Sequence, residues 1–76
     1  MSAAGISRED VEALVLHCID QDRGTRAEIE RQANRHNPGD PGGNFSAVNA
    51  ALERMKARRV IYFSKVRRMW FRRREP

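Results

Sequence analysis

The sequence has few of the residues on which several classes of functional site depend. Its one cysteine, Cys18, cannot form an internal disulfide, so nothing indicates an oxidising compartment. Together with the two histidines, His17 and His36, it leaves too few soft ligands for a four-ligand zinc site. No Ser-His-Asp set, carboxylate pair or glycine-rich phosphate loop is apparent. We therefore expect no metal, no other cofactor and no enzymatic activity.

Long hydrophobic runs are missing as well. The longest apolar runs, residues 13–16 and 60–63, are four residues long, whereas a membrane-spanning helix needs about 20 apolar residues. The start of the chain, residues 1–5, lacks the basic and apolar regions of a signal peptide. We expect no membrane partner and a cytoplasmic location. The length of 76 residues predicts one small domain of modest stability.

Positive charge is abundant and is distributed unevenly. Fifteen Lys and Arg residues against ten Asp and Glu give a net charge of +5. Residues 1–46 carry five basic and eight acidic side chains, a net charge of −3, whereas residues 47–76 carry ten basic and two acidic side chains, a net charge of +8. This asymmetry predicts one basic face and a polyanionic partner. The alternative is a solvated basic surface that only maintains solubility.

Capping residues mark the starts of two helices. Ser7 begins a capping pattern that predicts a helix from about residue 8 to 20. Thr25 begins a stronger capping box, which predicts a second helix from about 26 to 36 with thin apolar content. The following segment, 37–44, contains two prolines and three glycines and is predicted to be a loop.

The second half of the chain changes from helical to extended patterns. Apolar residues at three- and four-residue steps predict a third helix from about 45 to 58. Two aromatic and β-branched runs, 60–63 and 69–71, favour strands, and the link 64–68 is short enough for a hairpin. The expected core comprises Val11, Leu14, Val15, Cys18, Ile19, Ile29, Val48, Leu52, Met55, Ile61 and Trp70, with Phe45 as a further candidate.

This order of elements resembles the winged helix-turn-helix superfamily. The resemblance rests on four segments, 24–29, 45–55, 58–63 and 68–71. It implies an α+β fold that is mostly α, with three helices and a C-terminal two-stranded β-hairpin as the wing.

The resemblance covers residues 8–72, which leaves 1–7 as a flexible N-terminus and 73–76 as a basic tail. Two departures stand out. The expected loop of eight residues is longer than the three- or four-residue turn of a compact helix-turn-helix. No glycine occurs at the exit of the third helix, where Ala57, Arg58 and Arg59 stand instead.

The resemblance also implies that the third helix lies in the major groove of DNA. Asn49 and Arg54 are then the side chains best suited to base edges, since Asn pairs with adenine and Arg with guanine. They lie on different sides of the helix, so we expect Asn49 to contact a base and Arg54 to contact a flanking phosphate. Ser46 suits a phosphate or a base. The alternative is an ordinary solvated helix face.

Cations near the hairpin are the second group of candidate contacts. Lys65, Arg67 and Arg68 crowd the hairpin tip, where they are expected to contact phosphates or a minor groove. Arg58 and Arg59, between the helix and the hairpin, are expected to contact phosphates. Arg72 and the two arginines after it are expected either to add non-specific affinity or to form a disordered tail. Cations on edge strands also prevent aggregation, which is the structural alternative.

The hairpin aromatics have two interpretations. Tyr62, Phe63, Trp70 and Phe71 are expected to lie in the core, because a small domain needs large apolar side chains. If they were exposed beside the arginines, they would instead indicate stacking on single-stranded nucleic acid.

The leading functional hypothesis is a small transcriptional regulator that binds double-stranded DNA, cytoplasmic and nucleoid-associated, of a phage, plasmid or bacterial system. One alternative is a winged-helix interaction module that docks its basic face on an acidic protein. The long loop and the thin second helix favour that alternative. A third hypothesis is RNA or single-strand binding. Whether two copies pair as a homodimer on DNA stays open.

Overall fold

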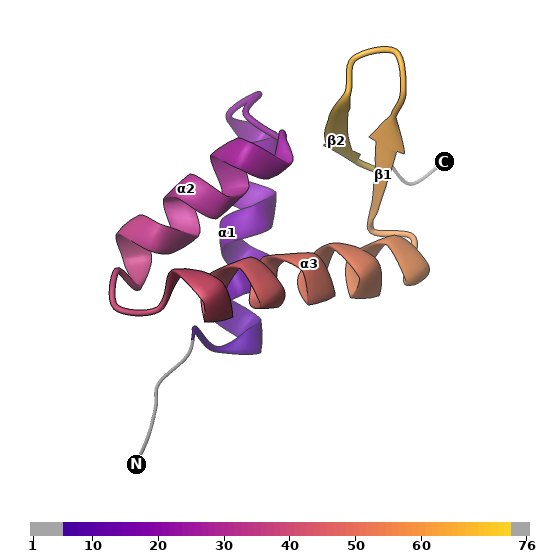
Figure 1. The fold of residues 1–76 in the computed structure, drawn as a ribbon. Helices are drawn as coiled ribbons and strands as arrows, with labels where there is room; N and C mark the ends of the chain where they lie inside the picture. The colour runs from indigo at the N-terminus through magenta and orange to yellow at the C-terminus, as the bar shows by residue number, and fades with distance from the viewer. Residues whose placement is uncertain (1–5, 74–76) are drawn as a thin grey trace.

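Three helices are followed by a β-hairpin, which confirms the predicted α+β, mostly helical fold class. The computed structural model describes residues 6–73. Along the chain lie α1 (Arg8–Asp20), α2 (Arg26–His36), α3 (Pro41–Ala57), β1 (Ile61–Ser64) and β2 (Met69–Arg72) (Figure 1). Most of the expected N-terminus and basic tail falls outside these residues. Within 1–7, Ile6 packs against the core and Ser7 caps α1.

The first two helices have the predicted bounds because their caps are local. The Ser7 hydroxyl accepts a hydrogen bond from the Asp10 backbone N–H at 3.1 Å. The Thr25 hydroxyl accepts one from the Glu28 N–H at 3.2 Å. Each bond satisfies a backbone donor that has no partner within the helix.

The third helix begins four residues earlier than predicted, at Pro41 rather than at Phe45. Asp40 is the N-cap, and its carboxylate accepts a hydrogen bond from the Gly43 N–H at 3.1 Å. Proline suits the first helical position, since its missing N–H would have no partner there. The prediction of an eight-residue loop was therefore wrong. The connection spans the four residues 37–40 and has the length of a helix-turn-helix turn.

A buried asparagine fixes this turn. Asn44, in the first turns of α3, is 1 % exposed. Its amide nitrogen donates to the side-chain oxygen of Asn34 at 3.0 Å and to the backbone carbonyl of Asn37 at 2.7 Å. Its side-chain oxygen accepts from the Asn37 amide at 3.0 Å. The end of α2, the turn and the start of α3 are thus joined by one satisfied polar group.

The exit of α3 uses an arginine where glycine is common. Arg59 has φ 62°, in the left-handed region. Its N–H donates to the Lys56 carbonyl at 3.0 Å, and the Val60 N–H donates to the Met55 carbonyl at 2.9 Å. This pair of bonds is a Schellman motif. The helix therefore ends at Ala57, and Arg59 takes the place of the missing glycine.

The hairpin is held to the helices by the segment between α1 and α2. β1 and β2 pair antiparallel, with Phe63 opposite Trp70 and Tyr62 opposite Phe71. On the other edge of β2, the Trp70 N–H donates to the Gly24 carbonyl at 2.9 Å. A Cβ atom at Gly24 would overlap the Trp70 carbonyl oxygen. Glycine is therefore required there for close approach of two backbones.

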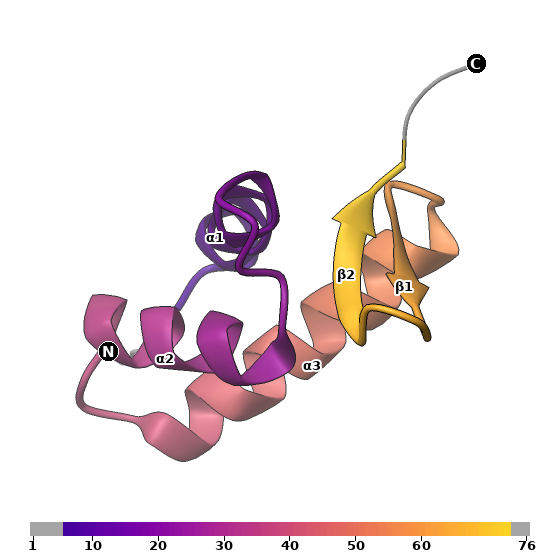
Figure 2. The same ribbon diagram turned by 90° about the horizontal axis from the view of Figure 1, so that it is seen from above.

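The core lies where the three helices meet, with β1 closing one end. Figure 2 shows α2 beside the N-terminal half of α3 and the hairpin over its C-terminal half. The buried apolar residues are Val11, Val15, Cys18, Ile19, Ile29, Ala33, Val48, Ala51, Leu52, Met55 and Ile61. Of the remaining core predictions, Leu14 and Trp70 are half-buried. The placement of Phe45 in the core was wrong, because its ring is 52 % exposed beside α2.

Gly24→Ala is expected to lower the free energy of unfolding by about 1–3 kcal/mol, the usual range for overpacking. The added methyl group must displace either Trp70 or the α1–α2 connection. Chemical denaturation monitored by Trp70 fluorescence measures the change. The matched control is Gly42→Ala, in the first turn of α3, where a Cβ meets no atom within 4 Å. That variant should be neutral or slightly more stable. Equal stability of the two variants would contradict the proposed role of Gly24.

Candidate nucleic-acid interface

The acidic residues of α1 neutralise part of the basic half of the chain. Glu12 accepts a hydrogen bond from Arg54 Nε at 2.9 Å and lies 3.7 Å from Arg58. Asp20 binds Arg72 through two hydrogen bonds, the shorter at 2.7 Å. Three of the residues predicted to contact nucleic acid are therefore occupied by carboxylates of α1. Arg54, with its side chain 27 % exposed, bridges α3 and α1 rather than facing away from them.

The Arg72 pair changes the ionisation of its partner. The hydrogen bond from Arg72, with the attraction of its charge, lowers the pKa of Asp20 below the ordinary aspartate value. This pair ties β2 to the end of α1, since the two residues are 52 positions apart in the chain. Arg72 thus has a structural role.

Other cations have no acidic partner in the part of the chain that the structure describes. Six cations around α3 and the hairpin have no described carboxylate within 4.0 Å of their charged groups. They are Lys56, Arg59, Lys65, Arg67, Arg68 and Arg73. Their charges are uncompensated, which is the property that a polyanion requires.

Two adjoining hollows collect most of these side chains. One, of about 450 Å³, is lined by Arg26, Glu53, Lys56, Phe63, Arg68 and Trp70. The other, of about 650 Å³, is lined by Lys56, Arg59, Ile61, Tyr62, Phe63, Lys65 and Arg73. They share Lys56 and Phe63, so they form one surface across the start of α2, the end of α3 and the hairpin. We call this surface, with its six cations and one acidic lining residue, the cationic face.

The hairpin aromatics divide into two pairs. Phe63 and Trp70 meet edge to face, with 5.3 Å between ring centroids, on the side of the cationic face. Tyr62 and Phe71 meet at 5.9 Å, and the Arg67 guanidinium lies 5.6 Å from the Phe71 centroid. Tyr62 is 42 % exposed and Phe63 is 45 % exposed. The expectation that all four aromatics lie in the core was therefore wrong for these two.

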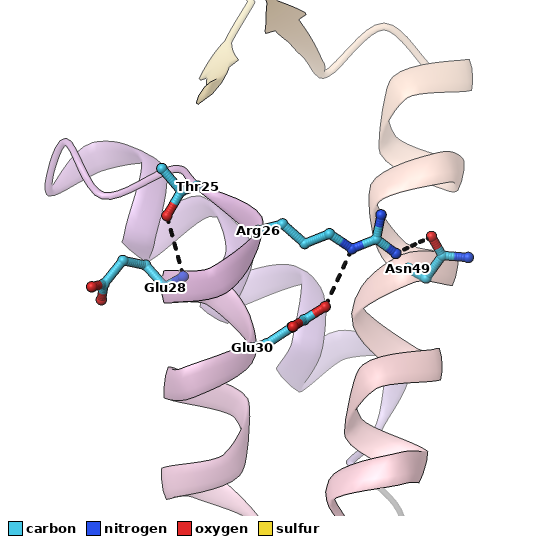
Figure 3. Close-up of polar contacts among 5 residues, drawn as sticks. All are labelled: Thr25, Arg26, Glu28, Glu30 and Asn49. Atoms are coloured by element: carbon cyan, nitrogen blue, oxygen red, sulfur yellow. Dashed lines mark hydrogen bonds and ion pairs between the residues drawn. The ribbon is translucent and has the colours of Figure 1, made fainter. Parts of the chain in front are cut away.

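Ser46 and Asn49 lie on the exposed side of α3. Asn49 is not a free side chain, however. Its Oδ1 accepts a hydrogen bond from a terminal guanidinium nitrogen of Arg26, the first residue of α2 (Figure 3). Arg26 also donates to Glu30 at 3.2 Å and lies over the Phe45 ring at 5.2 Å from its centroid.

Sequence reasoning missed Arg26, Lys56 and Phe45 as members of this region. Lys56 lies two turns after Asn49, a spacing that places both on one side of a helix. That signal was available in the sequence. The Arg26 contact joins residues 23 positions apart, and no local pattern predicts it. The hairpin tip is as expected, with Lys65, Arg67 and Arg68 exposed around Val66, which is 92 % exposed.

Residues 6–73 contain no group of three or more His, Cys, Asp or Glu side chains that could hold a metal ion. Burial raises the pKa of the Cys18 thiol, which keeps it protonated and unreactive. Within the same residues, no helix has the length and apolar character needed to cross a membrane.

Comparison with protein-family models, curated proteins and solved structures finds no match to this chain. Its function is therefore inferred from its own side chains.

The Asp20–Arg72 pair predicts an acid-sensitive contribution to stability. Because folding lowers the pKa of Asp20, the stabilisation is present above the ordinary aspartate pKa of about 3.9 and is lost as the pH falls through the lower folded value. Asp20→Asn should therefore be less stable than wild type at pH 7, and the difference should shrink below pH 4. Thermal unfolding at several pH values measures it. Asp22→Asn is the control, since Asp22 makes no ion pair with Arg72. A difference in thermal stability between wild type and Asp20→Asn that stays constant as the pH changes would contradict the pairing.

Proposed function

We propose that this protein binds double-stranded DNA, with α3 in the major groove and the hairpin on the flanking backbone, and acts as a small transcriptional regulator. The observation that supports the proposal is the cationic face. It combines the start of α2, the end of α3 and the hairpin. In helix-turn-helix proteins the second helix of the motif lies in the major groove and the first crosses the DNA backbone. The four-residue turn between α2 and α3 also suits this geometry.

Each part of the proposed interface has a distinct expected role. α3 presents Ser46 and Asn49 on its exposed side, and the major groove is wide enough to admit an α-helix. Lys56, Arg59 and Lys65 are suited to phosphates, because they are exposed and have no described acidic partner. Arg67 and Arg68 extend these contacts at the hairpin tip. Such contacts supply affinity without sequence choice.

Three of the predicted residues are left out of the proposed interface. Arg54 and Arg58 are bound by Glu12, and Arg72 is bound by Asp20. Contact with phosphate would require them to give up these partners. Their proposed role is to hold α3 and β2 against α1. A cytoplasmic, nucleoid-associated location and pairing of two copies on a palindromic site belong to the same proposal.

Single-stranded nucleic acid is the second candidate ligand. Tyr62 and Phe63 expose large rings beside Lys56, Arg59 and Lys65, an arrangement suited to base stacking. The acidic-protein alternative is weaker than the sequence indicated, because the long loop that favoured it is a four-residue turn.

A charge-matched pair of variants tests the cationic face. The face variant replaces Lys56, Arg59 and Lys65 with Ala. The control variant replaces three exposed arginines that pair with no described carboxylate: Arg8 in α1, Arg23 in the α1–α2 connection and Arg35 in α2. Both lose three positive charges. We expect the face variant to bind random duplex DNA more weakly, with a salt slope reduced by about one for each lost phosphate contact. The control variant should retain most of the wild-type slope.

The same titration with single-stranded DNA separates the two candidates. Tighter binding of wild type to single strands than to duplex, lost in Tyr62→Leu and Phe63→Leu, would support the second candidate. Equal loss in the face and control variants would show that the cationic face has no special role. No binding of wild type to any nucleic acid at low salt would turn attention to an acidic protein partner.

Arg59 gives a prediction in which stability and binding move in opposite directions. Its left-handed backbone conformation is strained for arginine and free of strain for glycine. Arg59→Gly should therefore be more stable by about 1 kcal/mol and should bind duplex DNA more weakly. Arg59→Ala, which keeps the strain and loses the charge, should show the same loss of binding without the gain in stability. Unchanged binding in both variants would remove Arg59 from the interface.

A further inference from the structure

The contact between Arg26 and Asn49 determines which way the Asn49 amide faces. A guanidinium group has five donors and no acceptor. The Asn49 atom that Arg26 touches must therefore be the oxygen, Oδ1, as the structure has it. The amide nitrogen, Nδ2, then points away from Arg26 (Figure 3). This orientation follows from the chemistry of the pair, since a nitrogen in that position would set donor against donor.

Arg26 is itself held from several directions. Its Nε donates to the Glu30 carboxylate at 3.2 Å, one turn along α2. Its guanidinium lies over the ring of Phe45, one turn before Asn49 on α3. Thr25 caps α2 directly before Arg26 and so fixes the position of its backbone. An arginine with a carboxylate, a ring and an amide around it has lost much of its freedom to turn elsewhere. It is suited to orient a neighbouring side chain.

The consequence concerns base choice. Asparagine pairs with adenine by using both ends of its amide, with the oxygen accepting from N6 and the nitrogen donating to N7. Here Arg26 uses one of the two lone pairs of that oxygen, and its positive charge disfavours the approach of a second N–H donor such as adenine N6. The end of Asn49 that stays fully available is the donor nitrogen, and guanine is the base that presents two adjacent acceptors, N7 and O6, in the major groove. Thymine offers only O4, beside a methyl group.

We infer that Arg26 is a positioning residue that leaves the donor nitrogen of Asn49 as its main reading group, so that Asn49 selects guanine rather than adenine. This inference rests on the proposed binding of duplex DNA and adds the base that α3 prefers at one position. It replaces the expectation of an Asn49–adenine pair. Arg26 acts through Asn49 and needs no base contact of its own.

Selection from random duplex oligonucleotides tests the inference, with wild type and variants processed in parallel. Wild type should enrich a motif with guanine at one position, preferred over adenine by about tenfold, a factor within the range for a good side-chain pair. Asn49→Asp keeps an oxygen toward Arg26 but has no donor, and its free oxygen accepts. It should lose guanine at that position alone and gain cytosine or adenine, whose amino groups donate.

Arg26→Met provides the test specific to positioning. It removes the guanidinium group, frees the Asn49 oxygen and should shift that same position from guanine toward adenine. A structural role alone would weaken binding to all sequences without changing the preferred base. The matched control is Arg31→Met, which removes an exposed arginine of the same helix that pairs with Glu28 and does not contact Asn49. Its motif should be that of wild type.

The outcomes separate this inference from the proposed function. A wild-type motif that Asn49→Asp leaves unchanged at every position would overturn the inference while duplex binding stands. So would adenine at the Asn49-dependent position in wild type, or an unchanged guanine preference in Arg26→Met. If wild type fails to bind any duplex in direct titration at low salt, both the proposed function and the inference are overturned.

Discussion

The position of α3 depends on a single buried amide. Asn44 is the one described polar side chain in the buried set, and it bonds to the end of α2 and to the turn through Asn34 and Asn37. Leaving such a group without partners costs about 1–3 kcal/mol, so the turn closes in the arrangement that satisfies it. Everything farther along α3 takes its place from this start. Asn49 then comes within reach of Arg26, and the far end of α3 supports the hairpin.

The uneven distribution of charge on the surface follows from where the acidic residues lie. α1 carries Glu12 and Asp20 on the side that meets α3 and β2, and these two carboxylates take up Arg54, Arg58 and Arg72. Of the other described cations of the basic half, five lie on the cationic face: Lys56, Arg59, Lys65, Arg68 and Arg73. The net charge of a half-chain therefore does not measure the charge of a surface. Ion pairs between the halves neutralise three of the nine cations in residues 47–73 and leave the other six without a carboxylate partner among the described residues.

The sequence predicted α1 and α2 correctly because each begins at a capping residue that bonds to a backbone N–H three residues later. Ser7 and Thr25 cap helices at their predicted first residues, and the apolar periodicity identified most of the core. The start of α3 was missed because a segment rich in proline and glycine has the composition of a loop. Its cap and first residue, Asp40 and Pro41, nevertheless suit a helix N-terminus. The aromatic strands were predicted correctly, but which rings face solvent depends on how the hairpin sits on α3.

The candidate site was predictable only in part, for a related physical reason. Exposed cations at the hairpin tip follow from the turn itself. The roles of Arg54 and Asn49 depend on partners 42 and 23 positions away, which periodicity along one helix does not reveal. The sequence pattern identified Asn49 as exposed on the third helix. Only the packing of α2 against α3 shows that its side-chain oxygen already accepts a hydrogen bond from Arg26.

Two arginines in left-handed conformations connect the strain in the backbone to the cationic face. Arg59 has φ 62° and Arg68 has φ 59°, a region that costs arginine about 1–2 kcal/mol. Glycine, or asparagine, would relieve the strain at either position. Each of these arginines lines one of the two hollows of the cationic face. Neither has an acidic partner among the described residues, so no ion pair offsets the strain. Backbone strain of this kind tends to occur at functional sites. Its coincidence with uncompensated positive charge favours an anionic ligand that would pair with these arginines, as the phosphates of a duplex would.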